Sequence, residues 1–186
     1  MNILELVDEE KEVVSHYLPH RPVFKRNSRT TKVRPVFDAS AVDKFGLSLN
    51  QCVEKGPNML EVIPAVLTKF RLGFIGVSAD IKKAFLQIAV APEDRDFLRI
   101  LWWTDEHQER MQTMRLTRVP FGLTSSPFLL EATISHHLNS IEDDFQDTAK
   151  TLMDSFYVDN CLVAVQSGEE YFRFKEEASD ITNRVV

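Results

Sequence analysis

Hydrophobic positions recur with helical spacing over one stretch of the chain and form a continuous run directly after it. Between Met59 and Leu72, apolar residues stand at positions 59, 60, 62, 63, 66, 67 and 70, which predicts an amphipathic helix ending at Gly73. The next run, residues 74–79, is mostly apolar, as strands buried on both faces are. We therefore expect a helix that leads into a central strand of a sheet.

Four further segments alternate like strands and form two pairs. The turn-rich residues 27–30 separate the first pair of strands. The polar residues 104–109 separate the second pair, which is expected to be antiparallel. The four strands cover residues 20–24, 32–37, 97–103 and 110–118.

A third antiparallel pair is predicted at residues 153–158 and 161–165, which are two β-favouring runs around Asp159-Asn160. Asp and Asn tolerate the positive φ that two-residue hairpin turns require. The turn would therefore consist of Asp159 and Asn160 and would hold Asp159 at an exposed tip.

Helix start signals occur at two places. Ser126 can cap a helix that runs to about Asn139 with Pro127 in its first turn, and residues 167–184 form a charged amphipathic helix with acids in its first turn. Residues 1–17 look weakly helical and residues 46–57 loop-like. Mostly antiparallel strands with helices on one face predict an α+β fold. The last helix lacks a stop signal, so we expect the chain to be part of something longer.

Charge qualifies this picture. The net charge of −6, with 44% hydrophobic and 27% charged residues, is ordinary for a globular protein and argues against a simple nucleic-acid-binding module. Residues 13–37, however, contain no acid. This basic arm can grip phosphates, or it is a solvated loop with chance clustering of charge. Its cations are Arg21, Lys25, Arg26, Arg29, Lys32 and Arg34.

Targeting and redox signals are few. No apolar run approaches the roughly 18 residues that a membrane span needs, and the acidic N-terminus lacks the pattern of a secretory signal. Cys52 and Cys161 have no metal-ligand spacing, which favours free thiols in a reducing compartment. We expect no membrane partner.

Two acids follow β-favouring runs, Asp80 at the end of one predicted strand and Asp159 in the hairpin. If the two strands are neighbours, the carboxylates could share a divalent metal, as phosphoryl transfer requires. Each acid alone is weak evidence, since an acid at a strand end often caps the turn that follows.

Two segments suggest phosphate contacts. Arg118 to Pro127 passes through Phe121 and Gly122 into a helix N-terminus, where backbone can approach a ligand closely, or it is an ordinary strand-to-helix connection. Lys32 and Arg34 share one face of a strand and can bind phosphate, or they are exposed charges that protect a strand edge.

In this order the motifs resemble the reverse transcriptases of long-terminal-repeat retrotransposons, most specifically the BEL/Pao group, over nearly the whole chain from about residue 13. The residues that carry the resemblance are His16-Tyr17-Leu18-Pro19-His20-Arg21-Pro22-Val23, Lys32-Val33-Arg34-Pro35-Val36-Phe37-Asp38-Ala39-Ser40, Gly46-Leu47-Ser48-Leu49-Asn50, Ala79-Asp80-Ile81, Pro92-Glu93-Asp94-Arg95 with Leu101-Trp102, Phe121-Gly122 with Ser126-Pro127, and Phe156-Tyr157-Val158-Asp159.

The resemblance implies the fingers and palm of a right-hand polymerase, with an antiparallel palm sheet backed by helices and no thumb. Residues 13–73 would be fingers-like, and residues 74–186 palm-like with part of the fingers. It implies Mg²⁺, with Mn²⁺ as an alternative, and an RNA or DNA template with primer and deoxynucleoside triphosphates. It also implies the remainder of a retroelement polyprotein as partner, in the cytoplasm within a virus-like particle.

The resemblance also assigns roles to single residues. Asp80, Asp159 and Asn160 take the catalytic positions, and the metal ligands are Asp80, Asp159 and the Ile81 carbonyl. Phe85 is similar to the aromatic residue that rejects a ribose 2′-hydroxyl. Residues assigned to the nucleotide are Lys32, Arg34, Phe85, Phe121 and Gly122; those assigned to primer or template are Tyr157, Arg21, Lys25 and Arg26.

One departure divides the functional hypotheses. The family usually has a second aspartate where this chain has the neutral Asn160, which lowers the negative charge available to a metal. The chain is then either an RNA-directed DNA polymerase, a nucleotidyltransferase, or an impaired remnant that retains only nucleic-acid binding. A nuclease or phosphatase using the same acids would leave Arg34 and Phe85 without a role.

Overall fold

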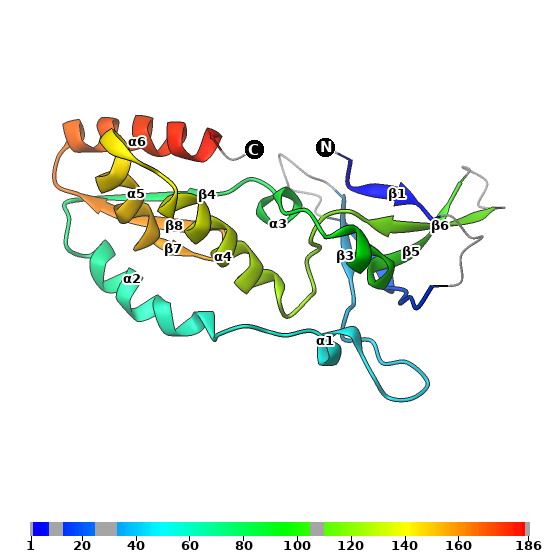
Figure 1. Ribbon diagram of the computed structural model, residues 1–186. Helices are drawn as coiled ribbons and strands as arrows, with labels where there is room; N and C mark the ends of the chain where they lie inside the picture. The colour runs from blue at the N-terminus through cyan, green and yellow to red at the C-terminus, as the bar shows by residue number, and fades with distance from the viewer. Residues whose placement is uncertain (1, 8–12, 25–32, 105–109, 185–186) are drawn as a thin grey trace. The chain divides into compact units, whose positions relative to one another are not determined.

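The computed structural model describes residues 2–7, 13–24, 33–104 and 110–184. The chain divides into two compact units. The first unit comprises Met1–Lys55 and Phe85–Ser126, and the second comprises Gly56–Ala84 and Pro127–Val186. The helices and strands of both units carry the labels of Figure 1.

A three-stranded antiparallel sheet in the order β1-β6-β5 forms part of the first unit. The strands are β1 (Leu4–Leu6), β5 (Arg99–Trp103) and β6 (Met111–Leu116). The predicted β5–β6 pair is confirmed, although its first two residues belong to the 3₁₀ helix η2 (Pro92–Leu98). The weak helix predicted for residues 1–17 is wrong at β1, because pairing with β6 supplies backbone hydrogen bonds that a weakly helical sequence cannot match.

The two predicted strands β2 (His20–Phe24) and β3 (Val33–Phe37) are confirmed, and they pair as an antiparallel hairpin. His20 lies opposite Phe37, and its ring stacks on Trp102 of β5 at 5.6 Å between centroids. Because cross-strand partners share a face, this face of the hairpin is aromatic. The turn residues 27–30 and four of the predicted cations, Lys25, Arg26, Arg29 and Lys32, lie outside the described residues.

A hydrophobic core and a short helix complete the first unit. Residues 46–57, expected to be a loop, contain α1 (Leu49–Cys52), which begins with a capping box between Ser48 and Gln51. The S-x-x-Q spacing was the signal that the interpretation as a loop overlooked. One cluster of buried core residues in this unit comprises Leu18, Ala39, Leu49, Leu98, Ile100 and Leu116.

A buried ion cluster connects η2 to the sheet. Asp96 accepts hydrogen bonds from Arg99 at 2.9 Å and from Arg115 at 2.7 Å. Glu5 of β1 pairs with Arg115 at 2.7 Å and with Arg95 at 3.2 Å. Asp96 and Arg99 are each 8% exposed, so neither charge has much water to replace a lost partner.

In the second unit, a three-stranded antiparallel sheet has the order β4-β8-β7. The predicted helices at residues 59–72, 126–139 and 167–184 are confirmed, and the mixed α+β class is confirmed with them. The elements are η1 (Met59–Val62), α2 (Ile63–Phe70), β4 (Ile75–Asp80), α4 (Ser126–Asn139), η3 (Asp143–Phe145), α5 (Gln146–Met153), β7 (Phe156–Tyr157), β8 (Asn160–Val165) and α6 (Gly168–Asn183), with the short α3 (Ala84–Gln87) where the two units join along the chain.

Helices approach this sheet from both faces rather than one. Ile181 of α6 packs with Val163 on one face of the sheet. Phe70 of α2 lies against Gly76 on the other face, because neighbouring residues of a strand point to opposite faces. Figure 1 shows α6 and α2 on the two sides of the sheet. Helix α5 was not predicted, since its eight residues are polar on most positions and only Thr148, Ala149 and Leu152 are buried.

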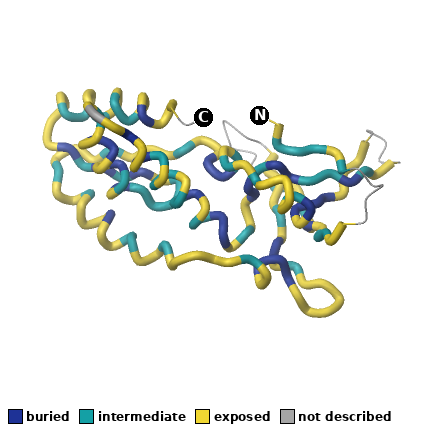
Figure 2. Tube along the Cα trace, in the orientation of Figure 1, coloured by how far each residue is buried: buried dark blue, intermediate teal, exposed yellow. Residues whose placement is uncertain are grey.

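The prediction of a buried central position for residues 74–79 is wrong. β4 is an edge strand of the described sheet, and all of its residues except Val77 are exposed (Figure 2). The central strand is β8, where Cys161, Val163 and Val165 are buried in alternation. An apolar run alone does not reveal whether a neighbouring strand will cover its second edge.

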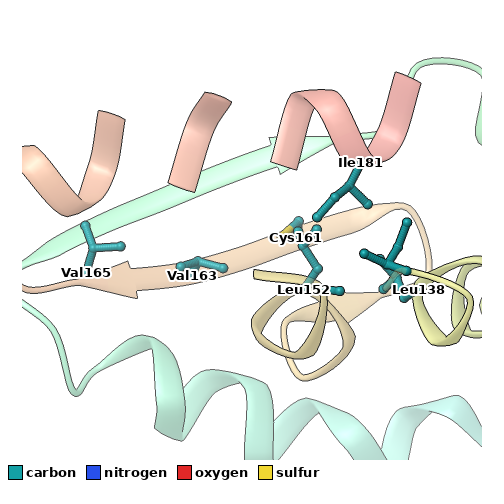
Figure 3. Close-up of a cluster of buried hydrophobic side chains, with 8 residues drawn as sticks. Leu138, Leu152, Cys161, Val163, Val165 and Ile181 are labelled. Atoms are coloured by element: carbon teal, nitrogen blue, oxygen red, sulfur yellow. The ribbon is translucent and has the colours of Figure 1, made fainter. Parts of the chain in front are cut away.

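The core of the second unit lies between β8 and the helices α4, α5 and α6 (Figure 3). Ser167 caps α6, accepting a hydrogen bond from the Glu170 N–H. Among the described residues, no helix combines the length and the hydropathy that crossing a membrane would require. The buried residues of this core cluster are Leu138, Ile141, Ala149, Leu152, Cys161, Val163, Val165 and Ile181.

Thiol reactivity should distinguish the two free cysteines. Cys52 is exposed, whereas burial raises the pKa of the Cys161 thiol from 9.0 to about 11. A thiol reagent at pH 8 is expected to label one thiol in the folded protein and two in denaturant. The Cys161 thiol loses its proton at a lower pH in the unfolded state, where its pKa is 9.0, than in the folded state, where its pKa is about 11. Its contribution to stability is therefore full below pH 9 and falls as the pH rises towards 11. If the reagent labels Cys161 in the folded protein as fast as it labels Cys52, Cys161 is not buried in β8.

Candidate active site

The hairpin turn differs by one residue from the prediction. Tyr157 pairs with Asn160, so the two turn residues are Val158 and Asp159. Asn160 is instead the first residue of β8, and its cross-strand partner on the other side is Asp80. The predicted exposure of Asp159 is wrong, because Asp159 is half-buried; Asn160 is exposed.

Val158 has a φ of +56°, a conformation that β-branched residues rarely adopt. A positive φ at only the first central residue is the pattern of a type II′ turn, where glycine is the usual residue. Strain of this kind costs about 1–3 kcal/mol and persists where the surrounding structure imposes it. Sequence reasoning overlooked Val158 because valine favours strands and therefore looks like part of one.

Val158→Gly is therefore expected to change the free energy of unfolding by less than about 1 kcal/mol, because relief of strain offsets the lost half-buried side chain and the added chain entropy. The same substitution at the buried Val163 should cost at least about 3 kcal/mol. Denaturant unfolding of the two variants measures the difference. Equal losses would mean that Val158 carries no strain.

The register of β4 and β8 brings the two acids together. Asp80 lies directly opposite Asn160, and the Ile81 N–H donates to the carbonyl oxygen of Asp159 at 2.9 Å. Asp80 and Asp159 thus occupy adjacent strand ends, as the sequence hypothesis required. Asp80 is exposed, and the Asn160 amide donates to an Asp159 carboxylate oxygen at 3.2 Å.

These residues offer hard oxygen donors of the kind that Mg²⁺ prefers. The donors are the two carboxylates and the Ile81 carbonyl, which also accepts from the Ala84 N–H at 3.2 Å. Among the described residues, no group of three His, Cys, Asp or Glu side chains could hold a metal ion. A divalent ion here would therefore depend on oxygens from a bound substrate, an arrangement common for Mg²⁺ at phosphate sites.

The second unit contains a cavity of about 310 Å³, and neither Asp80 nor Asp159 lines it. Val158 lines it, together with residues of α2 and α4, and an ion pair between Lys69 and Asp154 at 2.8 Å lies at its wall. Tyr157, assigned to the primer by resemblance, is half-buried in β7.

In the first unit, two of the predicted cations lie on one face of the β2–β3 hairpin. Arg34 is opposite Val23, and Arg21 stands two residues before Val23, so Arg21 and Arg34 project from the same face. Both are exposed. This face is basic, whereas the opposite face carries His20 and Phe37.

The remaining predicted nucleotide-binding residues also lie together in the first unit. Phe85 is 6% exposed, and Phe121, 51% exposed, meets it edge-on at 4.6 Å between ring centroids. Gly122 has a φ of +109°, and a Cβ added there would lie 2.5 Å from the carbonyl oxygen of Phe37. The glycine is thus required by a close approach of two backbone segments.

An antiparallel α+β fold with two aspartates at adjacent strand ends defines a class, the fingers and palm of a right-hand polymerase. The chain belongs to the reverse transcriptase (RNA-dependent DNA polymerase) family, whose pattern matches residues 23–185. No curated protein sequence matches it.

Solved structures of foamy virus proteins share the fold. The native protease–reverse transcriptase of prototype foamy virus is 17% identical, with a TM-score of 0.68 over 98% of this chain and 20% of its own. A foamy viral protease–reverse transcriptase in complex with double-stranded DNA is 19% identical, with a TM-score of 0.66 over 98% of this chain and 27% of its own. A complex with an RNA/DNA hybrid is 17% identical, with a TM-score of 0.60 over 96% and 20%. This chain thus spans about a fifth of the first of these proteins.

Proposed function

We propose that the chain contributes the catalytic carboxylates of an RNA-directed DNA polymerase encoded by a long-terminal-repeat retroelement of the BEL/Pao type. The observation that supports it most is the register of β4 and β8, which brings Asp80 and Asp159 to adjacent strand ends. The foamy virus proteins of the same fold bind double-stranded DNA and an RNA/DNA hybrid in two of their structures. The motif order of residues 16–50 supports the BEL/Pao assignment.

In this proposal Asp80, Asp159 and the Ile81 carbonyl would hold Mg²⁺, or Mn²⁺, against the triphosphate. The metal supplies charge neutralisation and lowers the pKa of the attacking primer 3′-hydroxyl. The 3′-hydroxyl would lose its proton to solvent, its oxygen would form a bond to the α-phosphorus, the bond from that phosphorus to the bridging oxygen would break, and pyrophosphate would leave. Asn160 would orient Asp159 through the hydrogen bond between their side chains.

The first unit would supply contacts to the substrate. Arg34 would bind the triphosphate, Arg21 on the same face would contact a template or primer phosphate, and Phe85 would exclude a ribose 2′-hydroxyl. Lys32, Lys25 and Arg26 keep the roles that the family resemblance assigns. A retroelement polyprotein in a cytoplasmic particle would be the setting.

Primer extension tests this function directly. The longest reading frame containing the chain is incubated with a primed RNA template, deoxynucleoside triphosphates and Mg²⁺ or Mn²⁺. Extension that chelation of the metal abolishes is expected. Cleavage of labelled RNA or DNA without added nucleotides, and no extension, would favour a nuclease instead.

Asn160 motivates a second candidate, an impaired remnant that binds nucleic acid without extending a primer. Such binding should weaken steeply as salt increases, because it depends on cations such as Arg21 and Arg34. It should also survive Asp80→Ala. A protein that binds no primed template even at low salt excludes this candidate.

Asn160→Asp is expected to lower the Mg²⁺ concentration for half-maximal activity by roughly tenfold, since it adds a charge at an exposed position beside both acids. Without metal the variant should be less stable than the unaltered protein by about 0.5–1 kcal/mol. The reason is that two negative charges, at positions 80 and 160, then lie directly opposite each other on neighbouring strands. Thermal unfolding with and without Mg²⁺ measures this effect even in an inactive protein. If Mg²⁺ does not change the melting temperature of this variant, the proposed metal site is wrong.

A further inference from the structure

Asn50 is a buried polar residue whose side chain joins three segments of the first unit. It is 8% exposed, and its amide nitrogen donates to the Ser40 hydroxyl at 2.9 Å and to the Gly122 carbonyl at 3.0 Å. Its amide oxygen accepts from the Thr124 N–H at 2.9 Å. The backbone N–H of Asn50 donates to the Ala39 carbonyl at 2.9 Å. Both its main chain and its side chain are therefore fixed.

The segment that Asn50 binds is held tightly elsewhere too. The Ser126 hydroxyl donates to the Pro120 carbonyl at 2.8 Å, and Gly122 lies against the carbonyl of Phe37 too closely for any side chain. Between these contacts, the Asn50 amide satisfies two further backbone groups, the Gly122 carbonyl and the Thr124 N–H. Only a side chain with both a donor and an acceptor of this reach can bind both groups, so Asp and Ala cannot replace it.

Phe121 projects from this segment and contacts Phe85. The two rings meet at 86°, 4.6 Å apart, and Phe85 is almost completely buried whereas Phe121 is half-exposed. A small rotation of residues 121–124 would move the Phe121 ring and remove the edge-on contact that orients the Phe85 ring. The chain of contacts runs from Asn50 through Gly122 and Phe121 to Phe85.

We propose that Asn50 is a positioning residue for sugar selection: it orients Phe121 and, through it, Phe85. This inference rests on the proposed polymerase function, in which Phe85 excludes a 2′-hydroxyl. Asn50 acts on the discrimination between deoxyribonucleotides and ribonucleotides, not on the metal chemistry of Asp80 and Asp159.

Single-nucleotide incorporation with a deoxynucleotide and its matching ribonucleotide tests the proposal. Asn50→Asp retains the acceptor for Thr124 but loses both donors, so the ratio of the two kcat/KM values is expected to fall about tenfold, mainly through KM. Ser40→Ala is the matched control, because it removes one partner of the same amide and leaves the bonds to Gly122 and Thr124. An unchanged ratio in Asn50→Asp, or an equal fall in Ser40→Ala, would overturn the proposal.

Two further measurements test the proposal if Asn50→Asp does not fold or if the protein is inactive. Phe121→Ala alters an exposed ring, so it should fold even if Asn50→Asp does not, and an unchanged sugar ratio in this variant also overturns the proposal. Amide hydrogen exchange needs no activity: Asn50→Ala should lose protection at residues 121–125 while β5 and β6 keep theirs. If the unaltered protein incorporates no nucleotide, the proposed function fails, and the exchange result decides whether Asn50 positions the segment.

Discussion

Asp80→Asn is expected to lower nucleotide incorporation by about a thousandfold or more. The side chain keeps its shape but loses the charge that would hold the metal against the triphosphate. Asp159 remains as the single anionic ligand, since the residue opposite Asp80 is the neutral Asn160. Because Asp80 is exposed and makes no packing contribution to the core, the fold should be unaffected.

Asp180→Asn is the matched control, because it removes one exposed acid of the same unit from α6. Incorporation is measured for both variants over a range of Mg²⁺ and Mn²⁺ concentrations, with circular dichroism to confirm folding. Activity of Asp80→Asn within tenfold of the unaltered protein would show that this carboxylate does not hold the metal.

Asp96→Ala is expected to destabilise the first unit by about 3–5 kcal/mol, the largest effect on stability. Removing Asp96 leaves the buried Arg99 without its carboxylate partner and takes one of two from Arg115. Water cannot replace this partner well, because the Arg99 side chain is 9% exposed. The cost therefore comes mainly from the unpaired buried charge rather than from the lost attraction itself.

Glu5→Ala provides the comparison, since Glu5 binds Arg115 and Arg95 in the same cluster but its side chain is 28% exposed. It should cost no more than about 1 kcal/mol. Denaturant unfolding, followed by the fluorescence of Trp102 and Trp103 on β5, measures both. If Asp96→Ala lowers the free energy of unfolding no more than Glu5→Ala does, burial does not increase the contribution of Asp96 to stability.

The hairpin illustrates how far sequence patterns reach. The β-favouring runs predicted β7 and β8, and the Asp-Asn pair predicted a turn at nearly the right place. The turn itself contains Val158 and Asp159, because the pairing of β8 with β4 takes Asn160 into the strand. Local preference would place Val158 in a strand; the tertiary pairing overrides it and leaves it at a φ of +56°.

Other differences have the same origin. The apolar residues of β4 predicted a strand but not that it would lie at an edge, since burial depends on partners far along the chain. The three residues of β1 belong to a segment whose pattern predicts a weak helix, and their strand conformation comes from pairing with β6. In the sequence Asn50 is only one residue of a longer motif, because its three side-chain partners lie 10 to 74 residues away.

By itself the sequence determined the helices α2, α4 and α6, the strand pairs β2–β3, β5–β6 and β7–β8, and the candidate acids Asp80 and Asp159. Periodicity, caps and turn residues are local properties, so they are visible in the sequence. Only the tertiary structure decided the register that brings the two acids to adjacent strand ends, the edge position of β4 and the hydrogen bonds of Asn50. These depend on contacts between distant segments, whose free energy comes from the fold as a whole and leaves no local pattern.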